Sequence, residues 1–153
     1  MRPSMPRLPR LARLSISTLM LAALSACGSG ISLDEPIEGP SWLLVQLGDQ
    51  PVGAGGDPRR DAQIVFDREG RVSGSGGCNR FSGGFVRTGS RLQISQLAAT
   101  KMACLEGART ANEMQFLQVL QTTASYRLVA PGRMLLIDAS GQTLATLTGA
   151  TAR

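Results

Sequence analysis

Histidine is absent from the 153-residue chain, and cysteine and aromatic residues are scarce. Aromatic side chains make up 4% of the sequence, and there are three cysteines. No cluster of metal ligands and no nucleophile–base pair occurs at a recognisable spacing. The sequence therefore predicts no catalytic residue, no metal and no cofactor, so we do not expect an enzyme. A site that folding assembles from serine and aspartate side chains is the alternative.

An excess of positive charge is also lacking beyond the N-terminus, although the formal net charge of the chain is +5. Four of the sixteen basic residues lie within the first 13 positions, and no acidic residue precedes Asp34. From Cys27 onward, twelve basic residues accompany eleven acidic ones. This part has no long run of Lys or Arg, and its aromatic residues are scattered. Such a composition argues against a nucleic-acid partner.

The first 26 residues have the layout of a bacterial secretory signal. A basic stretch ends at Arg13, and the uncharged segment LSISTLMLAALSA over 14–26 follows. The charge-free stretch 14–33 also admits an uncleaved membrane anchor, which needs about 20 residues. Glycine and serine in its last part make it a poor membrane segment. We therefore expect a cleaved signal peptide over residues 1–26.

The tetrapeptide LSAC, residues 24–27, resembles the lipobox of bacterial lipoproteins. In those proteins the cysteine is acylated and becomes the mature N-terminus, and several acyl chains such as palmitate hold it stably on a membrane. The resemblance implies lipidation of Cys27 and a location in the bacterial cell envelope. Gly28 at the next position favours the outer membrane, facing the periplasm. The membrane is thus one expected partner, and an envelope protein of unknown identity is the other.

Lipidation of Cys27 leaves Cys78 and Cys104 as an even pair. Beyond the inner membrane the environment is oxidising, so a disulfide between them is expected. The chain-entropy model assigns roughly 3.5 kcal/mol to a loop of about this length. A redox-active pair is the alternative. It is disfavoured because the sequence has no Cys-x-x-Cys motif and no histidine to stabilise a thiolate.

Short strand patterns dominate the chain from residue 41 onward. The pattern recurs about seven or eight times between Gly, Pro, Asp and Ser turns, starting at 41–47 and ending at 143–148. Residues 48–61 predict a loop. Residues 27–40, with small residues, acids and prolines, predict a flexible tether. We therefore expect a domain over 41–149 that is mainly β, with a small antiparallel barrel-like sheet and one packed α-helix.

The segment TANEMQFLQVLQTTAS, residues 110–125, predicts that helix. Thr110 and Glu113 have the spacing of a capping box, in which hydroxyl and carboxylate each bind a free backbone N–H. Four apolar residues are expected to share the face that packs on the sheet, namely Met114, Phe116, Leu117 and Leu120.

The glycine-rich stretch GSGGCNRFSGGF, residues 74–85, lies between two predicted strands. A Walker-type phosphate loop needs Lys and then Ser or Thr after its glycines, followed by a helix. Here Asn79 and Arg80 follow Cys78, and strand-like residues come next. A dinucleotide-binding loop also needs a following helix. The stretch therefore predicts a sharp bend that uses glycine for close backbone approach.

This stretch also resembles the first signature of the META/HslJ-like domain, Gly-Cys-Asn-x-aromatic-x-Gly-x-aromatic. The segment LQISQLAATKMAC, residues 92–104, is similar to the second signature, with Lys101 where arginine is common. SW at 41–42, EMQFLQVL at 113–120 and LLIDASGQTLATL at 135–147 also resemble the family pattern. The matching positions form the expected family motif: Gly77, Cys78, Asn79, Phe81, Gly83, Phe85, Thr100, Met102, Ala103 and Cys104.

The resemblance implies a fold more than a function. Members are small β-rich domains, many are envelope lipoproteins, and some are linked to heat shock or novobiocin resistance. It implies a non-enzymatic envelope protein that acts in stress or drug tolerance through protein contacts, with inhibition of a periplasmic hydrolase as a variant. The alternative is a barrel that binds a small apolar ligand. A filled interior of the barrel favours the protein that acts through contacts. An apolar pocket of several hundred Å³ favours the barrel that binds a ligand.

Overall fold

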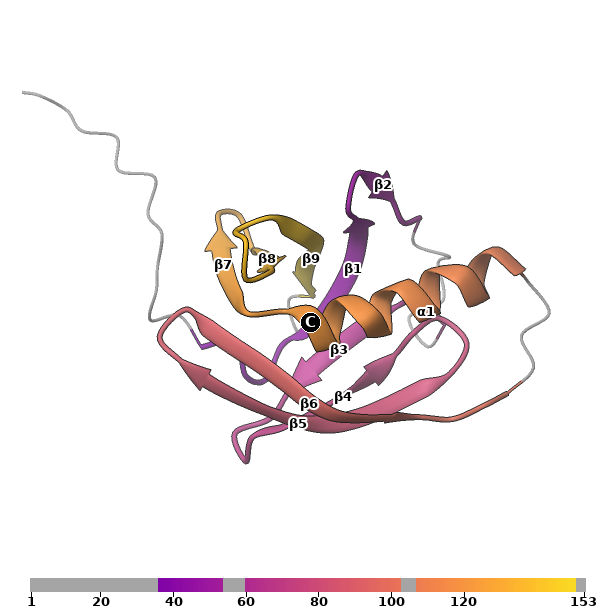
Figure 1. Ribbon diagram of the computed structural model, residues 1–153, viewed down its shortest axis with the longest axis horizontal. Coiled ribbons are helices and arrows are strands. Elements are labelled where there is room, and N and C mark those ends of the chain that lie inside the picture. Colours follow the sequence, from indigo (N-terminus) through magenta and orange to yellow (C-terminus); the bar gives the residue numbers. More distant parts are fainter. Residues whose placement is uncertain (1–35, 54–59, 103–106, 151–153) are drawn as a thin grey trace, which may run out of the picture.

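The computed structural model describes residues 36–53, 60–102 and 107–150, with the backbone alone at 107–110 and 150. Its described residues form nine strands and one helix (Figure 1). In chain order these are β1 (Ser41–Leu47), β2 (Gln50–Pro51), β3 (Gln63–Phe66), β4 (Arg71–Ser75), β5 (Arg80–Thr88), β6 (Arg91–Ala99), α1 (Gly107–Thr122), β7 (Ser125–Val129), β8 (Arg133–Ile137) and β9 (Thr143–Ala150).

The strands form one antiparallel sheet that closes on itself. Their order is β2-β1-β3-β4-β5-β6-β7-β8-β9, and β1 also pairs with β9 to complete a ring. Between β6 and β7 the described residues pair only at Arg91 and Ser125, so the ring is irregular there. The helix α1 packs against β6 beside this point (Figure 1). The predicted fold class, a mainly β barrel-like sheet with one packed helix, is confirmed.

The interior of the ring is filled with apolar side chains. Every strand except β2 contributes to it, and so does α1, because alternate residues of each strand point inward. Phe81 of β5 meets Phe116 of α1 edge to face, with ring centroids 6.1 Å apart. Phe66 and Phe85 make a similar contact at 5.0 Å. This arrangement is the one expected for a packed core.

The folded part of the chain begins before the predicted domain start at residue 41. Ile37 is fully buried, and its carbonyl oxygen accepts a hydrogen bond of 2.9 Å from the indole N–H of Trp42. The backbone N–H of Gly39 donates to the carbonyl oxygen of Phe66. Residues 36–40, predicted as part of the tether, therefore belong to the domain. Residues 1–35, including the predicted signal and Cys27, lie outside the described residues.

The helix begins at Gly107, three residues before the predicted start at Thr110. The predicted capping box is therefore wrong, because Thr110 lies within the helix and the Glu113 carboxylate binds a turn of the sheet instead. Met114 is 64% exposed, whereas Phe116 is fully buried. A helix turns about 100° per residue. The face that buries Glu113 and Phe116 consequently leaves Met114 in solvent, which corrects its predicted burial.

Local turn chemistry agrees with the sequence. The turn between β8 and β9 is held by Asp138, whose Oδ1 accepts hydrogen bonds from the backbone N–H groups of Ser140 and Gln142. The Ser140 hydroxyl bonds to the same oxygen and is the main reason that the pKa of Asp138 is lowered. Gly141 follows with φ +90, a value that glycine adopts readily. The predicted loop 48–61 additionally contains β2.

Candidate functional site

The candidate site is the turn between β4 and β5 together with the residues that hold it. We name it the motif corner and define it as Gly76, Gly77, Cys78, Asn79, Thr100, Met102 and Glu113. The backbone N–H of Gly76 donates to the carbonyl oxygen of Asn79 at 2.8 Å and so closes the turn. Gly77 has φ +113, which explains why glycine stands there. The predicted bend between two strands is therefore confirmed.

The carboxylate of Glu113 occupies the inside of this turn. Its Oε2 accepts hydrogen bonds from the backbone N–H groups of Cys78 (3.0 Å) and Asn79 (2.6 Å). Its Oε1 accepts a third from Nδ2 of Asn79 at 2.7 Å. Successive backbone N–H groups that converge in a turn form a binding site for an anion. In this protein the chain's own buried carboxylate fills that site and fastens α1 to the sheet.

Asn79 links the turn to the end of β6 as well. Its side chain is buried, and Oδ1 accepts hydrogen bonds from the Thr100 hydroxyl (2.9 Å) and the backbone N–H of Met102 (2.7 Å). The Thr100 hydroxyl in turn accepts one from the backbone N–H of Arg80 at 3.1 Å. One side-chain amide thus joins three separate parts of the chain. These contacts give Asn79 and Thr100 of the family motif a structural role.

Gly76 of the motif corner and Gly83 of the family motif allow close packing. A Cβ added at Gly76 would lie 2.7 Å from Oε2 of Glu113, so a side chain there would displace the carboxylate. A Cβ at Gly83 would lie 2.7 Å from the carbonyl oxygen of Ser95 and 2.9 Å from Cδ2 of Leu97. Both approaches are tighter than a side chain tolerates. These glycines permit the contacts between elements.

The remaining motif positions are partly outside the described residues. Phe81 and Phe85 are buried in the core. Ala103 and Cys104 lie in the segment 103–106, which is not described. The disulfide between Cys78 and Cys104 therefore stays a prediction.

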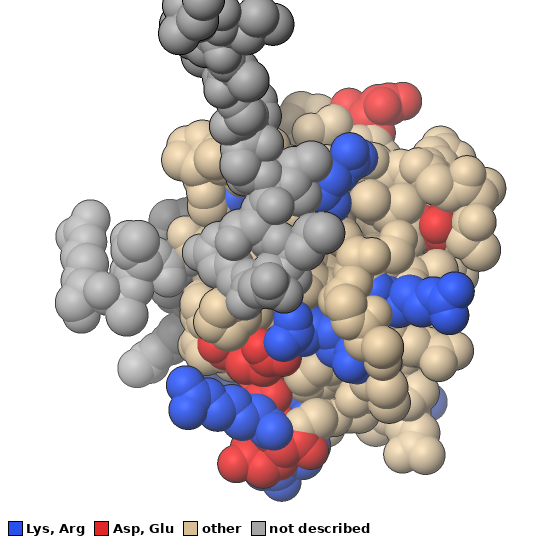
Figure 2. Space-filling model, turned by 90° about the vertical axis from the view of Figure 1, so that its left-hand side faces the viewer, with Lys and Arg blue, Asp and Glu red and all other residues tan. Residues whose placement is uncertain are grey.

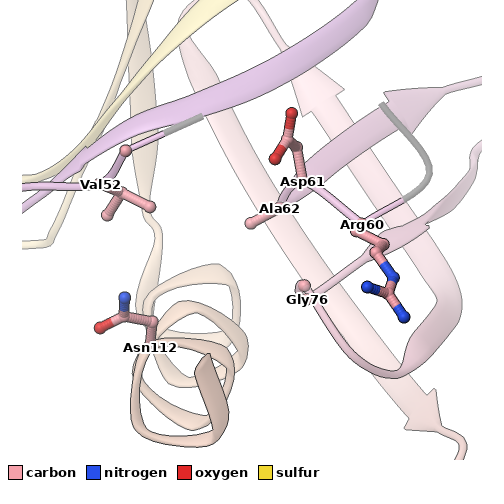
Figure 3. Close-up of a pocket in the computed structure, with 8 residues that line it drawn as sticks. Val52, Arg60, Asp61, Ala62, Gly76 and Asn112 are labelled. Carbon is pink, nitrogen blue, oxygen red and sulfur yellow. The ribbon is translucent and has the colours of Figure 1, made fainter. Parts of the chain in front are cut away.

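A small hollow lies beside the motif corner (Figure 3). Its volume is about 80 Å³, whereas small-molecule sites have several hundred. In Figure 3 Val52, Ala62 and Asn112 surround it, and the Arg60 guanidinium is directed away from Asn112. A few water molecules would fill this space. The lining residues are Val52, Gly53, Arg60, Asp61, Ala62, Gly76, Gly77 and Asn112.

The buried polar side chains of the described residues are satisfied by hydrogen bonds. Each buried side-chain nitrogen or oxygen among them has a hydrogen-bond partner. In the same part of the chain, no group of three or more His, Cys, Asp or Glu is arranged to hold a metal ion. The sequence did not reveal the role of Glu113, which binds residues 34 and 35 positions away. The one indication in the sequence was that this carboxylate lies on the apolar face of the predicted helix, where a charged side chain needs a partner.

Comparison with known proteins identifies the family. Residues 35–151 match the META domain. The fold is similar to a protein solved by NMR that is 26% identical, with a TM-score of 0.59 over 73% of this chain and 90% of that one. It is also similar to an NMR structure of a protein from Burkholderia xenovorans, 24% identical, with a TM-score of 0.60 over 76% of this chain and 85% of that one. No curated protein matches the chain. Since the match covers well over half of its length, this chain belongs to the META domain family.

Proposed function

We propose that this protein is a non-enzymatic lipoprotein of the cell envelope that acts in stress or drug tolerance through contacts with another envelope protein. One observation carries the proposal: the polar groups of the motif corner bond to one another while apolar side chains fill the ring. The described interior therefore offers little to a substrate or an apolar ligand. The outer surface is where we place the function.

Two exposed methionines are the contact surface that we propose: Met102 of the motif corner, and Met114, which follows Glu113 in the sequence. Met102 is 60% exposed, and its backbone is fixed by Asn79. Met114 is 64% exposed and directly follows Glu113, which binds the same asparagine. Single exposed apolar residues are common in proteins. Here the backbone of Met102 and the side chain of Glu113, next to Met114, both bond to Asn79, and methionine is frequent at protein-binding surfaces.

A photo-crosslinking residue placed at Met102 or Met114 should capture the same envelope protein in living cells. The matched control is position 86, since Val86 is 67% exposed but lies on β5 away from the turn. The captured protein is then identified by mass spectrometry. Identical products at all three positions, or none at 102 and 114, would contradict the proposed surface. A periplasmic hydrolase among the products would favour the inhibitor variant.

The anchor is tested separately at the N-terminus. The described residues contain no helix long and apolar enough to cross a membrane. We expect the mature chain to begin at Cys27, with acyl groups on its sulfur and its amine, because the lipobox-like LSAC places the cleavage point between Ala26 and Cys27. Mass spectrometry of the detergent-extracted protein measures this directly. A mature chain that starts at another residue, or an intact chain from Met1, would refute the lipoprotein assignment.

A further inference from the structure

Three exposed arginines stand side by side on the outer face of the ring. They are Arg91 of β6, Arg127 of β7 and Arg133 of β8, here called the arginine row. Arg91 pairs with Ser125, two residues before Arg127. Arg127 pairs with Leu135, two residues after Arg133. Such diagonal neighbours on adjacent strands lie about 7–8 Å apart.

Strand alternation directs the arginine row outward. Leu92, Tyr126 and Met134, which adjoin the three arginines in sequence, are buried in the core. Because successive side chains of a strand point to opposite faces, the arginines face solvent. The row is thus fixed by the sheet itself.

The positive charge of the row is not neutralised within the described residues. Glu38 lies near this end of β6, but its carboxylate pairs at 3.0 Å with Arg87, the strand partner of Leu92. No ion pair within the described part of the chain involves the row. Like charges on neighbouring strands are destabilising. An uncompensated row is therefore suited to an anionic partner.

The arginine row lies at the end of the molecule from which the N-terminal segment leaves. Glu38 binds Arg87, and Arg87 pairs with Leu92 of β6, next to Arg91. Figure 1 places the turn between β5 and β6 at the left, near the start of the coloured chain. Figure 2 shows that side of the molecule, with blue basic side chains spread across it. Most of the red acidic atoms lie beside blue ones toward the bottom.

The length of the tether keeps this end close to an anchored Cys27. The folded part is described from Pro36, so residues 28–35 separate it from the cysteine. A chain of this length spans at most about 30 Å when fully extended. The motif corner lies at the other end of β6, since Met102 is eleven residues after Arg91 and a strand rises about 3.3 Å per residue.

We propose that the arginine row binds the phosphate groups of anionic phospholipids, so that this end of the domain rests on the membrane. The motif corner then points away from the bilayer, where an envelope protein can reach Met102 and Met114. This orientation rests on the proposed lipid anchor, whereas the affinity of the row for lipid does not.

Vesicle binding by an unlipidated chain tests the proposal. A chain from residue 28 retains every core residue of the described structure, and the two similar NMR structures consist almost entirely of the matching domain. Sedimentation with vesicles of phosphatidylcholine, with and without phosphatidylglycerol, measures binding at about 0.1 M salt, where the Debye length is about 10 Å. Each arginine near an anionic surface contributes about fivefold to partitioning. Arg127→Gln with Arg133→Gln should therefore weaken binding by on the order of twentyfold, and adding Arg91→Gln by on the order of a hundredfold.

The matched control removes the same charge from the other end, with Arg80→Gln and Lys101→Gln, both exposed. It should change binding by less than about threefold, since these residues lie more than a Debye length from the bilayer. Equal binding to neutral vesicles, no binding, or equal losses in both variants would overturn the proposal. These outcomes are distinct from failure of the anchor, which the N-terminal mass spectrum reports. They are also distinct from failure of the protein contact, which crosslinking reports.

Discussion

Glu113→Ala is expected to lower the free energy of unfolding by about 3–5 kcal/mol, because three hydrogen-bond donors lose their acceptor at once. Asn79 is buried, so water replaces the lost carboxylate poorly at its N–H and its amide. The helix would also lose its polar attachment to the turn between β4 and β5. Urea denaturation, followed by the change in midpoint at constant slope, measures the effect.

Two further variants separate the carboxylate from the helix. Glu113→Gln keeps the shape of the side chain. Both carboxylate oxygens of Glu113 accept hydrogen bonds, whereas a glutamine amide has only one oxygen that can accept. This variant should therefore lower the free energy of unfolding by about 2 kcal/mol. Gln115→Ala, at an exposed position of the same helix, should change stability by less than about 0.5 kcal/mol. If Glu113→Ala were as stable as Gln115→Ala, the network would not hold the turn.

Replacing both Cys78 and Cys104 by alanine should destabilise the domain by roughly 2–5 kcal/mol, the usual cost of losing a bridge from a small exported domain. The bridge would join the turn to the segment that leads into α1, because Cys104 lies between Met102 and the helix start at Gly107. Thermal melts of the chain from residue 28 compare the variant with the parent. No chemical activity should be lost with the bridge.

Thiol counting gives the independent readout of the same bridge. Protein from an oxidising compartment should show no reactive thiol at Cys78 or Cys104 after denaturation. Two free thiols would refute the disulfide and restore the redox alternative. Because Cys78 and Glu113 hold the same turn, their effects should couple. The variant that lacks both the bridge and the carboxylate should lose less stability than the two separate losses predict.

Local patterns predicted the strands and turns of this fold well. The first strand was expected over residues 41–47 and is observed as Ser41–Leu47. The glycine-rich stretch was expected to bend between two strands, and Ser75 and Arg80 bound that bend. Alternation and turn residues act over a few positions, so one sequence suffices to read them.

Contacts between distant segments could not be predicted in the same way. Thr110 and Glu113 have the spacing of a local cap, but the carboxylate binds a turn 34 and 35 residues earlier in the chain. Two converging backbone N–H groups and an amide proved the better partners. The pairing of β1 with β9 joins residues about as far apart as the domain allows. Periodicity carries no information on such partners, because only the folded chain brings them together.

Closure of the sheet by β1 and β9 has a consequence for how the chain reaches this state. Ser41 pairs with Ala150, so the first long strand has no partner on that side until the last strand is available. Contacts this far apart in sequence form late, since the intervening chain must be ordered first. Until then, an unpaired edge of β1 is open to association with other chains. A chain threaded through a membrane from its N-terminus would complete its ring only when its C-terminal strand has crossed.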